Sequence, residues 1–308
     1  MQDVFPKATF NLLCLLLALL APASFAQQPS ALSPNPALKS AICPIVYPHD
    51  QAIGSKGLRY TFFGNAFFIN KQGYLVTAAH VMQTFRDSGQ PYILLDRPNA
   101  PAQTVKANIV AIDWTHDVAI LRAIPNPFQG KFRVAFLQLA ANRPSPGDAV
   151  VATALHPANI RTASTYQLPV QDWSSAQVLG VVQTRQDPNL PETDLFLFSH
   201  EVKLGQSGSP VLLASSHEVA GLVDGRWLRP STFSLPSADG SLPTRYTGPL
   251  GAAVPIDYLL TLLEKNSIPW STASNANLPA EAPQEKGKER KSGEGRSGGD
   301  EVISLIYI

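Results

Sequence analysis

The sequence is poor in cysteine, with only Cys14 and Cys43 among its 308 residues. This scarcity excludes the small disulfide-scaffold proteins, whose stability depends on several bridges, so a hydrophobic core must stabilise the fold.

An excess of charge of either sign is also missing, because 24 Lys and Arg residues balance 23 Asp and Glu residues. Proteins that bind nucleic acid or an anionic membrane surface usually carry a basic excess. We therefore expect neither kind of partner.

Long apolar runs are absent except for one near the amino end, over residues 12–20. Lys7 precedes this run, and residues 24–26, Ser-Phe-Ala, follow it. A basic start, a short apolar run and a small-x-small motif are typical of a secretory signal peptide, and the run is short for a permanent membrane span. We predict a signal peptide over residues 1–26, cleavage after Ala26, a periplasmic or secreted protein, and no stable membrane anchor after cleavage.

Removal of the signal peptide would leave Cys43 as the last cysteine. One cysteine cannot form an internal disulfide, although the exported compartment would allow one. Two interpretations stay open: Cys43 is a buried apolar residue, or it is a thiol that pairs with another molecule.

Short β-patterned segments, by contrast, are abundant. The 27 prolines and 20 glycines imply many turns and short elements. From residue 44 to residue 254, segments rich in β-branched and aromatic residues recur at the spacing of a sandwich or barrel, among them GYLVTAAHV, DVAILRA, DAVVATAL and EVAGLVDG. The turn motif Ser-Pro-Gly-Asp at residues 145–148 could join two similar halves. The pattern predicts an all-β fold.

Helical periodicity replaces the β pattern near the carboxyl end, within residues 255–266. Four apolar side chains fall on one face at helical spacing there: Ile256, Leu259, Leu260 and Leu263. Pro255 suits a helix start, and Lys265 lies near the end. The segment predicts one terminal helix.

The two flanks of this region differ from it in composition. Residues 27–43 are rich in Pro and Ser, so we expect a flexible lead-in. Residues 271–308 carry many charges, Gly and Pro, so we expect a disordered tail. The last seven residues, Val-Ile-Ser-Leu-Ile-Tyr-Ile, are apolar again. They could add a strand to a sheet edge, serve as a ligand for a partner, or have no role.

Three segments carry residues suited to nucleophilic catalysis. His80 ends GYLVTAAH, Asp117 precedes the strand pattern Val-Ala-Ile-Leu, and Ser207 lies within Gly-Gln-Ser-Gly-Ser-Pro. A hydroxyl is a poor nucleophile at neutral pH and needs a positioned base, which in turn needs an orienting carboxylate. We predict Ser207 as the nucleophile, His80 as general base and acid, and Asp117 as the orienting carboxylate. Asp113 competes with Asp117 for that role.

Gly205, two positions before Ser207, lets the backbone turn so that the N–H groups of Gly205 and Ser207 converge on a developing oxyanion. The same residue types also make plain surface turns, which is the alternative interpretation. The order His, Asp, Ser, each in a β-context, is that of the chymotrypsin-type fold, whereas an α/β-hydrolase places its serine first. The order favours the catalytic interpretation.

On these motifs the chain, over roughly residues 50–266, resembles a trypsin-like serine protease, nearest to the bacterial HtrA/Deg type. FFINKQGYLVTAAHV is similar to the family's catalytic-histidine segment and DWTHDVAIL to its aspartate segment. The resemblance implies a protease domain over residues 44–270, made of two six-stranded antiparallel barrels (about 44–145 and 146–254) and a C-terminal helix. It also implies hydrolysis of peptide bonds through an acyl-enzyme, polypeptide substrates and no cofactor.

The chain departs from the family pattern around its nucleophile. HtrA-type proteins usually show Gly-Asn-Ser-Gly-Gly, whereas Gln206 and Ser209 give a motif closer to the glutamyl endopeptidases of the same fold. Those enzymes are expected to carry a histidine where Val223 stands, so a glutamate preference has only weak support. Gln206 also replaces the aspartate that pairs with a new amino terminus in digestive proteases, so the site is either preformed or ordered by substrate. Only 38 residues follow Trp270, so we expect no PDZ domain.

Two carboxylates are candidates for substrate binding. By spacing from Ser207, Glu201 falls near the base of the S1 pocket and Asp224 on the strand that lines it. A buried carboxylate there would favour a basic substrate side chain. The alternative is that Glu201 points to solvent, because an unpaired buried carboxylate is costly.

Two further expectations concern metals and a different class of function. The remaining histidines show no metal-ligand spacing, so we predict no metal site: His49, His116, His156, His200 and His217. A protease-fold protein that is catalytically weak or inactive and acts as a binding or chaperone-like module stays open, because Gln206 and Ser209 are atypical.

Overall fold

The computed structural model describes residues 36–49, 59–86, 89–156, 168–185, 187–228, 233–235 and 244–272. The predicted signal peptide and the apolar end of the tail lie outside the described residues, as do most of the lead-in and nearly all of the tail. Within the described part of the chain, no helix is both long and apolar enough to cross a membrane.

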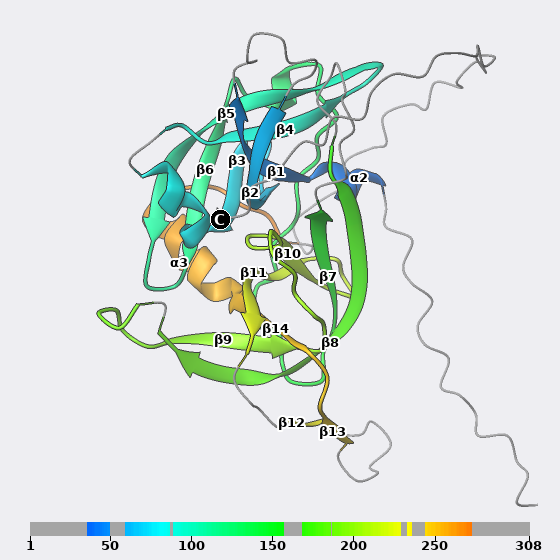
Figure 1. The fold of residues 1–308 in the computed structure, drawn as a ribbon, viewed down its shortest axis with the longest axis vertical. Coiled ribbons are helices and arrows are strands. Elements are labelled where there is room, and N and C mark those ends of the chain that lie inside the picture. Colours follow the sequence, from blue (N-terminus) through cyan, green and yellow to red (C-terminus); the bar gives the residue numbers. More distant parts are fainter. Residues whose placement is uncertain are drawn as a thin grey trace, which may run out of the picture. The chain divides into compact units, whose positions relative to one another are not determined.

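The first barrel is a closed antiparallel sheet of six strands in the order β1-β2-β3-β6-β5-β4 (Figure 1). Its strands are β1 (Ile42–His49), β2 (Arg59–Phe68), β3 (Tyr74–Ala78), β4 (Tyr92–Arg97), β5 (Ala100–Asp113) and β6 (Val118–Ile124). A 3₁₀ helix, η1 (Ala79–Phe85), follows β3, and a second, η2 (Pro127–Gln129), follows β6.

The structure extends the first barrel beyond its predicted start at residue 44. Helix α2 (Pro36–Ser40) and the first residues of β1 occupy part of the predicted lead-in. Ile42 is 6% exposed and Cys43 is 1% exposed. Burial of these two apolar side chains stabilises the added residues of the strand.

The second barrel has the same architecture, with six antiparallel strands in the order β10-β11-β14-β9-β8-β7. Its strands are β7 (Ala149–His156), β8 (Val170–Thr184), β9 (Thr193–Phe198), β10 (Pro210–Leu213), β11 (Val219–Trp227) and β14 (Leu250–Pro255). Strands β12 (Phe233–Leu235) and β13 (Thr244–Tyr246) form a separate two-stranded sheet.

Aromatic and β-branched side chains fill both barrels, as their enrichment in the sequence predicts. Phe67 and Phe68 are fully buried in the first barrel, and Phe196 and Phe198 are 1% and 0% exposed in the second. Gly251 permits this packing, because a Cβ atom there would lie 2.4 Å from the Phe198 ring. The predicted fold class, two six-stranded antiparallel barrels and a C-terminal helix, is confirmed.

Helix α3 (Ile256–Lys265) follows β14 directly, with Pro255 as its N-cap. Its buried face differs by one residue from the predicted face: it consists of Ile256, Leu259, Leu262 and Leu263. Leu260 is half-buried at the edge of that face. The helix packs on β11 and β14.

Arg143, in the segment between the barrels, ties α3 to β9. Its guanidinium donates two hydrogen bonds to Asp257 (Nε to Oδ1, 2.6 Å; Nη2 to Oδ2, 2.7 Å) and one to Asp194 (Nη1 to Oδ2, 2.6 Å). It also lies 5.0 Å from the centre of the Tyr258 ring. Bidentate pairing of this kind fixes orientation as well as distance.

The structure buries Cys43, which agrees with the first of its two interpretations. The Sγ atom lies 3.7 Å from the carbonyl oxygen of Ala66 and donates to it. Burial raises the pKa of the Cys43 thiol, which keeps it protonated and unreactive.

Candidate active site

Strand pairing brings His80 and Asp117 together. Ala78, at the end of β3, pairs with Val118, at the start of β6, so the residues just beyond each strand end meet. The Nδ1 atom of His80 lies 2.7 Å from Oδ2 of Asp117, and the backbone N–H of His80 donates to Oδ1 at 2.8 Å. The Asp117 side chain is 3% exposed and that of His80 is 41% exposed. The carboxylate thus fixes the orientation of the His80 ring through Nδ1.

Asp113, the competing acid, lies elsewhere in the same turn. Its carboxylate accepts hydrogen bonds from the backbone N–H groups of Thr115 and His116, and it bonds Nδ1 of His116 at 2.6 Å. The His116 ring stacks on Tyr258 of α3, with ring centres 3.9 Å apart. Asp113 therefore shapes the turn that leads into Asp117, and it does not bond His80.

Ser207 lies in the loop between β9 and β10, flanked by two glycines with left-handed backbone. Gly205 has φ +85° and Gly208 has φ +77°, a region that strains other residues. The Gly208 N–H donates to the Val223 carbonyl of β11 at 2.8 Å. Among the described residues, no acceptor receives a hydrogen bond from the N–H of Gly205 or of Ser207. Both predicted oxyanion-hole donors are thus open to a ligand.

The hydroxyl of Ser207 does not bond the His80 ring in this structure. Its Oγ atom donates to the backbone carbonyl oxygen of Asp224, at 3.3 Å. Catalytic hydrogen bonds are often long or misaligned in a ligand-free site and tighten only with substrate.

Asp224 lies beside the histidine. One potential ligand atom each from His80, Asp117 and Asp224 lies within 4.8 Å of the other two. From its spacing we predicted Asp224 on the strand that lines the S1 pocket. Strand β11 does carry Asp224, and its carboxylate lies near His80 and Asp117. A register shift in β11 between Val223 and Gly225 accompanies this position, and no local pattern in the sequence marks it.

The two carboxylates control the charge of His80. Burial lowers the pKa of His80, but the hydrogen bond and the charge of Asp117, together with the charge of Asp224, outweigh burial and raise it overall.

His80, Asp117 and Asp224 are also the one group among the described residues with the donor types and spacing for a metal ion. The absence of a metal stays a prediction.

Glu201 lies at the surface, which is the alternative that the sequence left open. Its side chain is 47% exposed and pairs with Arg226, which is 54% exposed, at 3.7 Å. The sequence analysis did not identify Arg226 as the partner of Glu201. Leu204, in the loop that carries Ser207, is 80% exposed.

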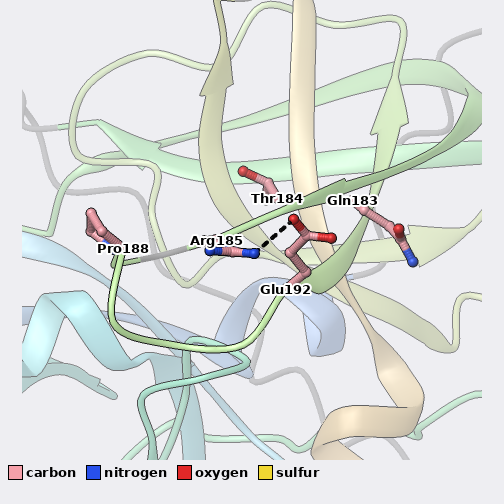
Figure 2. Close-up of a pocket in the computed structure, with 5 residues that line it drawn as sticks. All are labelled: Gln183, Thr184, Arg185, Pro188 and Glu192. Atoms are coloured by element: carbon pink, nitrogen blue, oxygen red, sulfur yellow. Dashed lines mark ion pairs between the residues drawn. The ribbon is translucent and has the colours of Figure 1, made fainter.

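A separate pocket of about 350 Å³ lies at the β8–β9 turn. Figure 2 shows its lining residues: Gln183, Thr184, Arg185, Pro188 and Glu192. Arg185 and Glu192 form an ion pair of 3.2 Å with both side chains about half exposed. None of the predicted site residues lines this pocket.

Asn65, on β2, is a site residue that sequence reasoning missed. It is completely buried, its side-chain amide donates to the Gly205 carbonyl at 2.9 Å, and its backbone N–H donates to the Ser207 carbonyl at 2.9 Å. Asn65 and Gly205 are 140 residues apart in the chain, so only the fold reveals their contact.

Comparison with solved structures finds similar proteins at low sequence identity. The MamO protease domain from Magnetospirillum magneticum is 13% identical, with a TM-score of 0.46 over 73% of this chain and 96% of that one. The active form of the Rv3671c protease from M. tuberculosis is 19% identical, with a TM-score of 0.48 over 82% and 96%. The HtrA-type protease AlgW, solved with a decapeptide, is 15% identical, with a TM-score of 0.49 over 75% and 65%.

Sequence comparison supplies the family. No curated protein matches the chain. The model of the trypsin-like peptidase domain matches residues 64–222, more than half of the chain, and this range contains His80, Asp117 and Ser207. The chain belongs to the family of trypsin-like peptidases.

Proposed function

We propose that the protein is a serine endopeptidase that hydrolyses peptide bonds through a triad of His80, Asp117 and Ser207. The observation that carries the proposal is the His80–Asp117 pair, joined by a 2.7 Å side-chain hydrogen bond and a 2.8 Å backbone hydrogen bond to the two oxygens of one carboxylate. Such a pair fixes the tautomer and direction of a general base. Asp113 serves His116, so Asp117 is the better candidate for the acid.

In the proposed mechanism, Oγ of Ser207 leaves the Asp224 carbonyl and attacks the substrate's carbonyl carbon while Nε2 of His80 takes its proton. The negative charge on the substrate oxygen is stabilised by the N–H groups of Gly205 and Ser207. His80 returns the proton to the leaving amine as the C–N bond breaks, which leaves an acyl-enzyme. Water then repeats the sequence, and Ser207 is regenerated.

The proposed compartment, substrates and mode of activation are inferred from the sequence. The predicted signal peptide supports an exported protein with polypeptide substrates, in the periplasm or outside the cell. Gln206 supports a site that needs no new amino terminus for activation, because its neutral amide cannot pair with an ammonium group.

One observation favours a second function, that of a non-catalytic binding module with the same fold. The Ser207 hydroxyl donates to the Asp224 carbonyl and not to His80. If that arrangement persists with ligand bound, Ser207 is not activated.

A fluorophosphonate probe separates the two functions, because it reacts covalently with an activated serine. The mature protein should be labelled at Ser207, and Ser207→Ala should abolish labelling. Ser209→Ala is a matched control: that hydroxyl is buried without a partner among the described residues, so its removal should leave labelling intact. A sample with added peptide covers activation by substrate. A folded protein that stays unlabelled in both samples would establish the binding module instead.

A further inference from the structure

The nucleophile loop of the second barrel is held by one residue of the first. Asn65 contributes two hydrogen bonds of 2.9 Å, from its side-chain amide to the Gly205 carbonyl and from its backbone N–H to the Ser207 carbonyl. The two accepting carbonyls belong to the same two residues whose N–H groups are the proposed oxyanion donors.

The side-chain bond fixes one particular peptide group. The Gly205 carbonyl belongs to the peptide that joins Gly205 to Gln206, between the two donor peptides. Gln206 closes the turn from within: its Oε1 accepts from the Lys203 N–H at 2.9 Å, and its own N–H donates to the Lys203 carbonyl at 3.2 Å. Asn65 holds the carbonyl of that same peptide from outside the turn. The contacts on its two sides together fix the plane of the central peptide.

Asn65 itself has no freedom to follow a displaced loop. Its carbonyl accepts a hydrogen bond from Oγ1 of Thr77 at 2.7 Å, and both residues are completely buried. A Cβ atom at Gly208 would lie 2.3 Å from the Asn65 carbonyl oxygen and 2.4 Å from Oγ1 of Thr77. A Cβ atom at Gly64 would lie 2.9 Å from the Ser207 carbonyl oxygen. The loop and the strand therefore touch with no space between them.

The oxygen of the Asn65 side-chain amide indicates the role of this residue. Its Oδ1 atom is buried and has no hydrogen-bond partner among the described residues. A buried acceptor without a partner is destabilising, so a residue chosen for stability alone would not be an asparagine. Among the residues that the structure describes, the amide makes one hydrogen bond, the donation to Gly205.

We propose that Asn65 is a positioning residue that holds the Gly205–Ser207 backbone in its oxyanion-binding conformation. This inference rests on the proposed function. Asn65 acts through the loop and does not contact substrate. In digestive proteases, an ion pair formed by an aspartate at the position of Gln206 orders this loop from within the second barrel. Here Asn65 orders the loop from the first barrel.

The test uses full-length mature protein with Asn65→Ala, Asn65→Asp and a matched control, Asn70→Ala. Asn65→Asp keeps the size of the side chain but turns the donor into a carboxylate facing a carbonyl. Asn70 is 7% exposed, donates to the Pro269 carbonyl at 2.8 Å and accepts from the N–H groups of Gln72 and Tyr74. Its loss should therefore destabilise the protein at least as much as the loss of Asn65, but away from the site. Near-ultraviolet circular dichroism and melting temperature are measured for each variant.

Two reactions without sequence preference report on the loop. The second-order rate of Ser207 labelling by a fluorophosphonate should fall roughly 10- to 100-fold in both Asn65 variants, less than the 10²–10³ lost with an oxyanion donor itself. With p-nitrophenyl acetate, the acylation rate constant should fall while the half-saturating ester concentration stays unchanged. Asn70→Ala should stay within about threefold of the wild-type rates.

The outcomes distinguish this inference from the function on which it rests. If the wild-type protein is not labelled at Ser207, the proposed function fails. If it is labelled and the Asn65 variants react at the wild-type rate, the positioning role alone is overturned. A rise in half-saturating concentration without a loss of rate, or unfolding of both Asn65 variants, also overturns it, because Asn65 would then serve binding or packing.

Discussion

Asp117 uses both carboxylate oxygens on a single residue, His80. Asp117→Asn replaces one oxygen by an NH₂ group, which cannot accept from Nδ1 and so favours the wrong tautomer of the ring. We expect turnover to fall by about 10⁴ with the fold retained, as in other triads. Peptidase assays and circular dichroism measure the two effects. Asp113→Asn should cost far less, because Asp113 bonds His116. Equal losses in the two variants would contradict the assignment of the acid.

Asp224 supplies a second negative charge to His80, and its effect has a definite sign. Asp117 and Asp224 together raise the pKa of His80 against the opposing effect of burial. Asp224→Asn removes one of these charges, so the pKa of His80 should fall. Only the neutral ring accepts a proton, so activity appears as the pH rises through this pKa. The variant should therefore retain activity at lower pH than the wild-type protein.

The pH dependence of the fluorophosphonate labelling rate measures this shift. Glu264→Gln, on the exposed side of α3, controls for a general change of charge and should leave the acid limb in place. An acid limb that moves to higher pH in Asp224→Asn would rule out the electrostatic role.

The site residues divide into those that the sequence could predict and those that it could not. His80, Asp117 and Ser207 each lie in a local motif whose residue types have a chemical role, so their order along the chain was informative. Asn65 has no such motif, and spacing from Ser207 predicted Asp224 in the S1 pocket but not its position beside His80. Their contacts depend on which strands pair and in what register, and on a shift within β11 that no turn signal announces.

At the scale of single elements, Arg143 ties α3 to β9. Arg143→Met removes the guanidinium from the Tyr258 ring and leaves Asp194 and Asp257 without their hydrogen bonds to it. The pairs are partly exposed, so we expect a loss of about 1–2 kcal/mol. For a domain of this size the melting temperature should fall by roughly 2–8 °C. Thermal melts at neutral pH measure it.

Arg185→Met is the control for Arg143→Met, because Arg185 pairs with Glu192 at 3.2 Å with both side chains about half exposed, and its loss should be close to zero. The pH dependence provides a second check. The hydrogen bond from Arg143 lowers the pKa of Asp194 below its ordinary value of 3.8. That stabilisation is complete above the ordinary value and is lost as pH falls through the lowered one. The gap between wild type and variant should therefore persist at pH 5.

The periodicity of α3 predicted a helix correctly and its buried face almost correctly. A 3.6-residue pattern identifies one stripe, and Leu260 and Leu262 lie on opposite sides of it. Contact with both β11 and β14 broadens the buried face toward Leu262. The helix pattern alone contains no information about where the neighbouring strands lie.

For the whole molecule, two truncations separate the core from the tail. The Ser271 carbonyl accepts a hydrogen bond from the Leu139 N–H at 2.9 Å, so the core continues past Trp270. Removal of residues 273–308 should leave melting temperature and labelling nearly unchanged, because residues 273–301 are mostly polar and charged. Equal melting temperatures would support a dispensable tail. A large loss would show instead that its apolar end packs on the barrels.

Truncation before Pro255 should have the opposite result. It removes four buried side chains of α3, each of which contributes roughly 1.5–3 kcal/mol. Their sum is comparable to the whole stability of a typical domain, roughly 5–15 kcal/mol. The truncated protein should melt at a much lower temperature or fail to fold, and a melt like that of the full chain would contradict the packing of α3.

The stacking of His116 on Tyr258 also bears on how the protein is made. The turn that carries Asp117 is completed by the first barrel, yet the ring that covers it belongs to α3, after both barrels. A ribosome adds Ser207 only after His80 and Asp117 have emerged, and Tyr258 later still. A nascent chain therefore lacks Ser207 for most of its synthesis. It also lacks Tyr258, which packs on the turn that carries Asp117, until synthesis is nearly complete. The order of residues alone would protect a cell from the proposed activity during translation.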